Sequence, residues 1–132
     1  MSEPAGFPNA THLNVLFPAL QKIALAPLVA SVTDAWYNQT LCRVNDSVVR
    51  LGVMQGAYHW HKHDADDEFF FVLEGRFLID LAPRDDGEPG EVVTLRPGEG
   101  FTVPKGVVHR TRAPERAVIL MVETANIVPT GD

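Results

Sequence analysis

The chain has 132 residues, enough for one domain with a single sizeable core and too few for two ordinary domains. Hydrophobic residues make up 45% of it and charged residues 21%, as in soluble globular proteins. A net charge of -6 argues against nucleic acid and anionic membrane surfaces as partners, which leaves small molecules and other protein chains.

The cysteine content and the apolar stretches bear on the compartment. Cys42 is the single cysteine and has no partner for an internal disulfide, which fits a reducing environment. The longest apolar stretch, Ile23 to Val32, is interrupted by Pro27 and is too short to span a membrane. Because the start of the chain also lacks the basic residues of a signal peptide, we predict a cytoplasmic protein.

Residues 1–27 are predicted to form an N-terminal arm with a short helical segment. The first eleven residues are rich in proline, glycine and small polar types, which indicates a loosely held arm. Apolar residues then recur at helical spacing from Thr11 to about Leu25, although Pro18 within the run would kink or restart a helix. We expect one or two helical turns here. We also expect the apolar stretch Leu16 to Val32 to pack against a second copy of the chain in a homodimer.

Residues 28–125 show the patterns of short strands. Val48 to Gln55 alternates in the manner of a strand, and Glu74-Gly75 marks a turn. Further strands are predicted at residues 69–73, 76–81, 92–95, 100–103, 107–112 and 117–123, with a hairpin loop at 83–91. Many short strands and almost no helix predict an all-β barrel or double-sheet jelly roll. With residues 126–132 as a tail, the whole chain 1–132 is predicted to be a single domain.

Three histidines and a glutamate have the spacing of a metal site. His61 and His63 project to the same side of a strand, because alternate residues share a face. Four residues then allow a turn before Glu68, and His109 follows about forty residues later on another predicted strand. Imidazole nitrogen with carboxylate oxygen suits Fe, Mn, Ni, Zn or Cu. We therefore predict one divalent transition-metal ion per chain, with a coordination position left open for water or substrate.

Two segments resemble the conserved motifs of the cupin superfamily. The first runs from Gly56 through His61-Lys62-His63 and Glu68 to Gly75, and the second from Gly98 through Pro104 and Gly106 to His109. Trp60-His61-Lys62-His63 further resembles small single-domain bacterial cupins, many of unassigned function. The resemblance implies a cupin jelly-roll β-barrel, commonly a homodimer, with His61, His63, Glu68 and His109 as metal ligands. The chain departs from the motifs at Gln55 and Ala113, neither of which is a ligand position.

The alternation along the strands indicates which side chains are expected around the metal. His59 shares the parity of His61, so it is either a partner of the ligands and a proton shuttle, or a histidine at the barrel mouth. The candidates for lining the pocket, which are otherwise core residues, are Gln55, His59, Phe70, Val72, Phe101, Val103, Thr111, Ile119 and Met121. Tyr58 and Trp60 are expected to point outward. Three arginines are candidates for binding a substrate carboxylate, with surface positions as the alternative: Arg43, Arg50 and Arg76.

The function predicted from these residues is that of a metal-binding cupin. The leading hypothesis is a metal-dependent enzyme acting on a small organic molecule, with Glu68 and His59 as candidate catalytic groups. Oxygenase, isomerase and lyase chemistry fit the same ligands, because function depends on the pocket rather than the fold. The alternative is a non-catalytic cupin that binds a small molecule for sensing or storage.

Overall fold

The computed structural model describes residues 10–84, 87 and 89–131. Within them the chain forms eight strands and one short helix, and residues 1–9 of the predicted N-terminal arm lie outside the described residues. In chain order the elements are β1 (Ala10–His12), α1 (Leu25–Ser31), β2 (Trp36–Val44), β3 (Ser47–Ala57), β4 (Glu68–Glu74), β5 (Phe77–Leu81), β6 (Glu91–Leu95), β7 (Gly100–Val103) and β8 (His109–Thr124).

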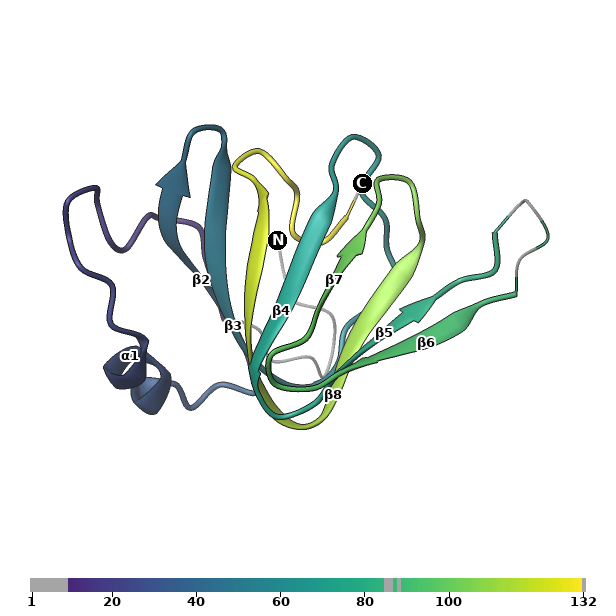
Figure 1. The fold of residues 1–132 in the computed structure, drawn as a ribbon, viewed down its shortest axis with the longest axis horizontal. Coiled ribbons are helices and arrows are strands. Elements are labelled where there is room, and N and C mark those ends of the chain that lie inside the picture. Colours follow the sequence, from purple (N-terminus) through teal and green to yellow (C-terminus); the bar gives the residue numbers. More distant parts are fainter. Residues whose placement is uncertain (1–9, 85–86, 88, 132) are drawn as a thin grey trace.

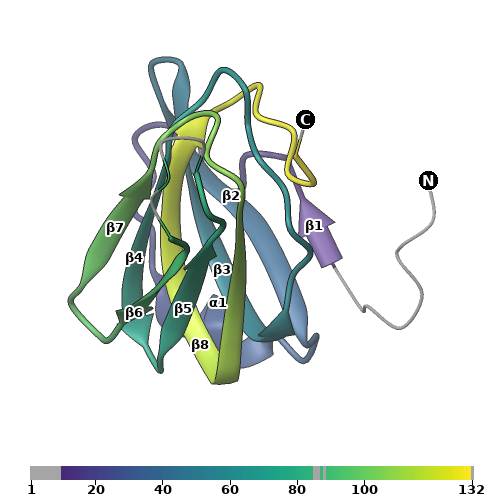
Figure 2. The same ribbon diagram turned by 90° about the vertical axis from the view of Figure 1, so that its right-hand side faces the viewer.

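All eight strands belong to one strongly curved sheet, as Figures 1 and 2 show. The order β1-β2-β3-β8-β4-β7 is hydrogen-bonded along its length, and the β5–β6 hairpin joins it through β8. The long strand β8 pairs with β5 over residues 109–112 and with β4 over residues 118–122. The all-β prediction is therefore confirmed, but the sheet remains open rather than closing into a barrel. The two predicted strands 107–112 and 117–123 correspond to one continuous strand, β8, which begins at His109.

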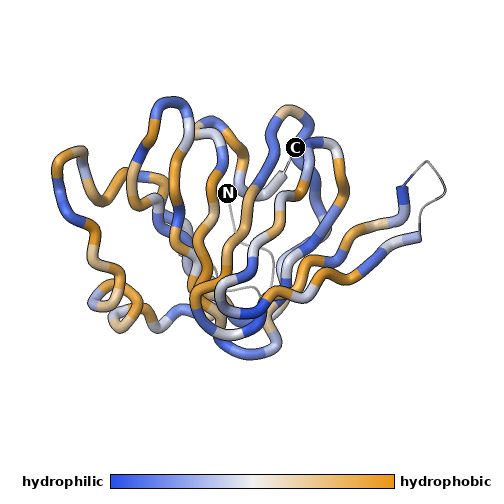
Figure 3. Tube along the Cα trace, in the orientation of Figure 1, coloured by the Kyte–Doolittle hydropathy of each residue, from blue (hydrophilic) through white to orange (hydrophobic). Residues whose placement is uncertain are grey.

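The two faces of the sheet support two separate apolar clusters. The inner cluster fills the concave side and contains Phe77, Ile79 and Ile119, all fully buried. The outer cluster lies under α1, on the other face of β2 and β3, and includes Leu51 and Val53. Successive residues of β3 therefore pack in different cores. For this reason both faces of the strand are buried over most of its length. Figure 3 shows apolar residues along both α1 and the strands.

The position of the helix differs from the prediction. The helix covers Leu25–Ser31, whereas residues 13–24 have no regular structure and Leu20 adopts a positive φ of 70°. Pro27 lies in the first turn of α1, where a backbone N–H group would have no acceptor within the helix. Proline therefore removes no helical hydrogen bond there. The helix packs on the outer cluster through an apolar stripe at i, i+3, i+4 and i+7, formed by Leu25, Leu28, Val29 and Val32. Half of the stretch predicted to contact a second copy thus packs on the chain's own sheet.

The described part of the chain contains no helix long and apolar enough to cross a membrane.

Candidate metal centre

The main chains of His61 and His109 are joined directly. The two residues form an isolated antiparallel bridge outside the longer ladders. The His61 N–H donates to the His109 carbonyl at 2.9 Å, and the His109 N–H donates to the His61 carbonyl at 2.8 Å. This reciprocal pair sets the separation of two imidazoles that lie 48 residues apart in the chain.

The loop that carries His63 to Glu68 is anchored on the turn before β8. The Gly106 N–H donates to the carbonyl of His63 at 2.8 Å. The Lys105 N–H donates to Asp67 Oδ1 at 2.9 Å, so the Asp67 side chain holds the loop in place. Glu68 then begins β4 opposite Val103 of β7. These contacts bring both ends of the loop to the same place as the His61–His109 bridge.

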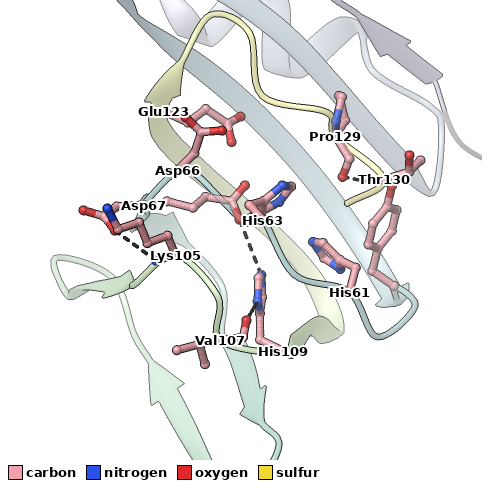
Figure 4. Close-up of polar contacts among 12 residues, drawn as sticks. His61, His63, Asp66, Asp67, Lys105, Val107, His109, Glu123, Pro129 and Thr130 are labelled. Carbon is pink, nitrogen blue, oxygen red and sulfur yellow. Dashed lines mark hydrogen bonds and ion pairs between the residues drawn. The ribbon is translucent and has the colours of Figure 1, made fainter. Parts of the chain in front are cut away.

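The structure brings the four predicted ligand side chains together. One ligating atom from each lies within 4.8 Å of the corresponding atom of every other, and we call this group the four-residue cluster: His61, His63, Glu68 and His109. Glu68 Oε1 lies 3.4 Å from His109 Nε2 and 3.6 Å from His63 Nε2. The side chains of His63 and His109 are 2% and 1% exposed. Figure 4 shows the imidazoles of His61 and His63, from one loop, and of His109, from a second segment, on the same side of the sheet.

Two of the imidazoles are held in the orientation that a metal ligand requires. His109 Nδ1 lies 2.9 Å from the carbonyl oxygen of Val107, and His61 Nδ1 lies 3.0 Å from that of His59. A carbonyl oxygen can only accept, so Nδ1 carries the proton in both rings. The Nε2 lone pair is then left to the cluster, as in metal sites where a backbone carbonyl fixes the tautomer of the ligand.

The electrostatics favour the unprotonated, ligating forms. Burial lowers the pKa of His61 to about 4, opposed by its hydrogen bond to the His59 carbonyl and assisted by His109. Burial acts to raise the pKa of Glu68, but its contacts with His109 and Glu123 leave it below the usual value. Within the described residues, the buried atoms Glu68 Oε1 and His109 Nε2 have no hydrogen-bond partner. A cation among them would satisfy both, so the donor set fits a metal ion.

A small cavity extends from the cluster across the concave face of the sheet. It leaves about 40 Å³ for the centres of water-sized molecules, a few times the ~10–15 Å³ that a single water requires. Its lining consists of Thr11, Trp36, Asn38, Arg50, Met54, Tyr58, His61, Glu68, Phe70, Thr111, Met121, Glu123 and Pro129. The cavity therefore has room for a few waters or one small organic molecule beside the cluster.

Three predicted lining residues are found around this cavity and the others are not. Phe70, Thr111 and Met121 line it. The remaining apolar candidates are packed within the inner cluster or against it: Val72, Phe101, Val103 and Ile119.

The predictions that Gln55 and His59 line the pocket and that Tyr58 points outward are wrong for a common reason. Arg50, Met54 and Tyr58 line the cavity with one parity, which continues past the register shift between Met54 and Gly56. His61 lines the same cavity with the opposite parity, so the change of face falls in the irregular residues 58–60, and counting back from His61 assigns the earlier residues to the wrong side. Gln55 and His59 are consequently exposed and lie outside the cavity lining, while Tyr58 is buried and lines it. His59 Nε2 contacts the Thr130 carbonyl at 2.9 Å, at the rim of the site.

Trp60 is exposed, as predicted, and the Arg110 guanidinium lies 5.0 Å from the centre of its ring. Arg43 and Arg76 take the surface alternative. Arg43 donates to the Asn45 carbonyl and Arg76 approaches Glu115 at 3.6 Å, both near solvent.

A buried ion pair was missed by reasoning on the sequence. Arg50 donates from Nη1 to Glu123 Oε1 at 2.9 Å, and the two side chains are 5% and 3% exposed. Burial, followed by the nearby Glu68 carboxylate, raises the pKa of Glu123, and the Arg50 guanidinium opposes that rise. In Figure 4, Glu123 lies at the end of the site away from His109. The available signal was a charged residue in each of two otherwise apolar stretches, residues 48–54 and 117–123, since buried charges normally have a partner.

Comparison with known proteins agrees with this geometry. Residues 48–123, more than half of the chain, match the family model described as a cupin domain. The chain belongs to the cupin family. The predicted cupin fold is thereby confirmed.

Relatives of this cupin include an uncharacterized protein and solved structures. The protein YdbB of Bacillus subtilis is 40% identical over 99 residues, which cover 75% of this chain and 82% of that one. A cupin-2 domain containing protein from Shewanella frigidimarina is 31% identical, with a TM-score of 0.67 over 77% of this chain and 93% of that chain. Hydroquinone 1,2-dioxygenase PnpCD in complex with Fe3+ has a TM-score of 0.70 over 82% of this chain and 33% of that chain. At 19% identity, that last likeness concerns the fold alone.

Proposed function

We propose that this cupin binds one divalent transition-metal ion through the four-residue cluster and acts on a small organic molecule held in the adjoining cavity. The observation that carries the proposal is the convergence of four ligating atoms within 4.8 Å, two of which are buried without a hydrogen-bond partner in the described chain. Closed structural sites use all their positions for protein ligands, whereas this cluster opens onto a cavity.

The residues around the cluster have distinct tasks in this proposal. The fixed Nδ1 protons of His61 and His109 present Nε2 as donors, and Glu68 supplies negative charge. Phe70 and Met121 form an apolar wall that limits the access of water. When bound, the ion supplies Lewis-acid or redox chemistry at an open coordination position. The likeness in fold to a dioxygenase solved with Fe3+ supports a metal-dependent reaction without selecting oxygenase over isomerase or lyase chemistry.

Metal analysis of purified variants tests the proposal. Wild-type protein, and a control carrying His12→Ala and His59→Ala, should each hold one transition-metal ion per chain, because both control histidines are exposed. The double variant His61→Ala with His109→Ala should hold almost none and should keep its fold, since its two cores are apolar. Unaltered metal content in that variant would remove the assignment. Oxygen uptake across candidate substrates then distinguishes an oxygenase from a non-catalytic metal-bearing binder.

We infer further that two copies of the chain associate through the segment 13–23. This segment presents five exposed apolar side chains, which is unusual for a single irregular stretch: Leu13, Val15, Leu16, Leu20 and Ile23. Val15, Leu20 and Ile23 themselves line a depression together with Phe17 and Cys42, and this depression is the surface that would receive the same segment of a partner. Burial of such a patch would remove a large apolar area from water.

Light scattering after size-exclusion chromatography tests this association. Wild-type protein should have twice the mass of one chain, and Leu20→Lys should shift the mass toward that of a monomer. Val92→Lys is the matched control, because Val92 is an exposed apolar residue of the β5–β6 hairpin far from the segment in sequence. A monomeric wild-type mass over a hundredfold range of concentration would refute the dimer.

A further inference from the structure

Four buried polar side chains form a continuous row on the concave face of the sheet. In strand order they are Thr40 on β2, Arg50 on β3, Glu123 on β8 and Glu68 on β4. Figure 1 shows these four strands side by side. We propose that Glu123, held by Arg50, is a positioning residue for Glu68 and thereby sets the affinity of the four-residue cluster for its metal ion. The inference rests on the proposed function, because Glu68 is one of the proposed ligands.

The first half of the row holds Glu123 in a fixed position. Thr40 lies directly opposite Arg50 in the ladder between β2 and β3, and its Oγ1 accepts from Arg50 Nε at 3.1 Å. Arg50 also lies opposite Met121 on β8, so Glu123, two residues further along, shares that face and is within reach of a long side chain. Arg50 donates from Nη1 to Glu123 Oε1 at 2.9 Å. The guanidinium thus connects β2 with β8 and engages one oxygen of the Glu123 carboxyl group.

The second half of the row joins Glu123 to Glu68. In the ladder between β4 and β8, Phe69 lies opposite Val122, and continuing that antiparallel register by one residue brings the two glutamates opposite each other. Burial, the charge of Glu68 and a side-chain hydrogen bond with Glu68 all raise the pKa of Glu123. The pKa of Glu68 is lowered, because hydrogen bonds with His109 and Glu123 outweigh the effect of burial. Two carboxyl groups in contact share one proton, and these opposite shifts assign it to Glu123, which therefore donates to Glu68.

The contact with Glu123 fixes the oxygen that Glu68 offers to the cluster. Glu68 Oε1 lies 3.4 Å from His109 Nε2 and 3.6 Å from His63 Nε2, and it has no hydrogen-bond partner within the described part of the chain. A glutamate side chain has several rotatable bonds, so its carboxylate has many orientations unless a partner restricts it. Glu123 restricts it before the ion binds, which lowers the entropic cost of binding. Partners of metal ligands typically change metal affinity by roughly 10–100-fold.

Zinc affinity, measured by competition with a chromophoric chelator, tests the proposal. The double variant Arg50→Met with Glu123→Leu replaces the pair by apolar side chains, which buried ion pairs often tolerate, and removes the support of Glu68. It should bind zinc roughly 10–100-fold more weakly than wild-type protein. Glu123→Gln keeps an N–H donor for Glu68 and an oxygen for Arg50, so its affinity should stay within about threefold of wild type. Arg76→Met with Glu115→Leu makes the same substitutions at an exposed pair and should bind as wild type.

The direction of these changes separates positioning from a simple effect of charge. The double variant removes one positive charge and at most one negative charge, so charge alone would leave zinc binding unchanged or make it stronger. Glu123→Gln would weaken zinc binding if Glu123 acted as a negative charge that attracts the ion. Positioning predicts the opposite result in both variants. Absorption spectra with cobalt in place of zinc give a second measurement, because they depend on the arrangement of the ligands. The spectrum should change in the double variant and be retained in Glu123→Gln.

The outcomes also separate this inference from the proposed function. An unaltered zinc affinity in the double variant, or a loss in Glu123→Gln as large as in the double variant, would overturn the inference. Urea unfolding establishes that each variant is folded, and Arg50→Leu with Glu123→Met serves if the first double variant is not. If wild-type protein binds zinc and all variants bind it equally, the inference alone fails. If wild-type protein binds no zinc, the proposed function fails and the inference with it.

Discussion

Acidification should destabilise the metal-free protein through His61. The pKa of this imidazole is lowered from 6.5 to about 4 by burial, so the unfolded chain binds a proton at a higher pH than the folded chain. Stability therefore falls as the pH drops from about 6.5 to about 4, and is insensitive to His61 outside that window. The direction follows because the unfolded state holds more protons throughout the window.

The expected loss follows from these two pKa values. Between pH 7 and pH 5, linkage gives a decrease of about 2 kcal/mol in the free energy of unfolding. Since His61 is only partly shielded from water, we expect roughly 1–2 kcal/mol. Bound metal should abolish the effect, because ligation excludes the proton from the same nitrogen.

Urea unfolding in the presence of a chelator measures this loss. The variant His61→Asn removes the titrating ring and keeps a donor for the His59 carbonyl, which His61 Nδ1 now serves. The pH-dependent loss should be smaller in this variant than in wild-type protein by the amount given above. His12→Asn, an exposed histidine, is the control and should behave as wild type. Equal losses in wild-type protein and His61→Asn would refute the reasoning, since all other titrating groups are common to both.

The other predictions concern stability. Gly75→Ala should lower the free energy of unfolding by roughly 1–3 kcal/mol more than Gly98→Ala. Both glycines have a positive φ, but of the two only Gly75 would place the new Cβ 2.5 Å from a backbone oxygen. Equal thermal unfolding of the two variants would contradict this. Glu123→Ala should cost roughly 3–5 kcal/mol by leaving the Arg50 charge buried alone, whereas the double variant Arg50→Met with Glu123→Leu should be nearly neutral, as checked by urea unfolding. Adding metal at a hundredfold excess over its Kd should stabilise wild-type protein by about 2.7 kcal/mol, with no shift in His61→Ala plus His109→Ala.

Local patterns in the sequence were sufficient to identify the strands and the candidate ligands. Alternation and turn residues located β3 to β7 to within a few residues, because a strand repeats every two residues whatever lies around it. The same period places His61 and His63 on one side, and the spacing to Glu68 leaves room for one turn. The structure brings these residues together with His109, while their binding of a metal stays a prediction.

What depends on contacts between distant segments had to come from the tertiary structure. The irregular residues 58–60 change the face that the side chains occupy, so counting back from His61 places Gln55 in the cavity and Tyr58 outside it, whereas the structure shows the reverse. The pairing of Arg50 with Glu123, 73 residues apart, likewise has no local signature. A period shows which residues share a face, but only the register between strands decides which face is buried and what lies opposite. That register is set by packing of the whole sheet, which is why the sequence alone identified the candidate ligands and the tertiary structure decided the pocket.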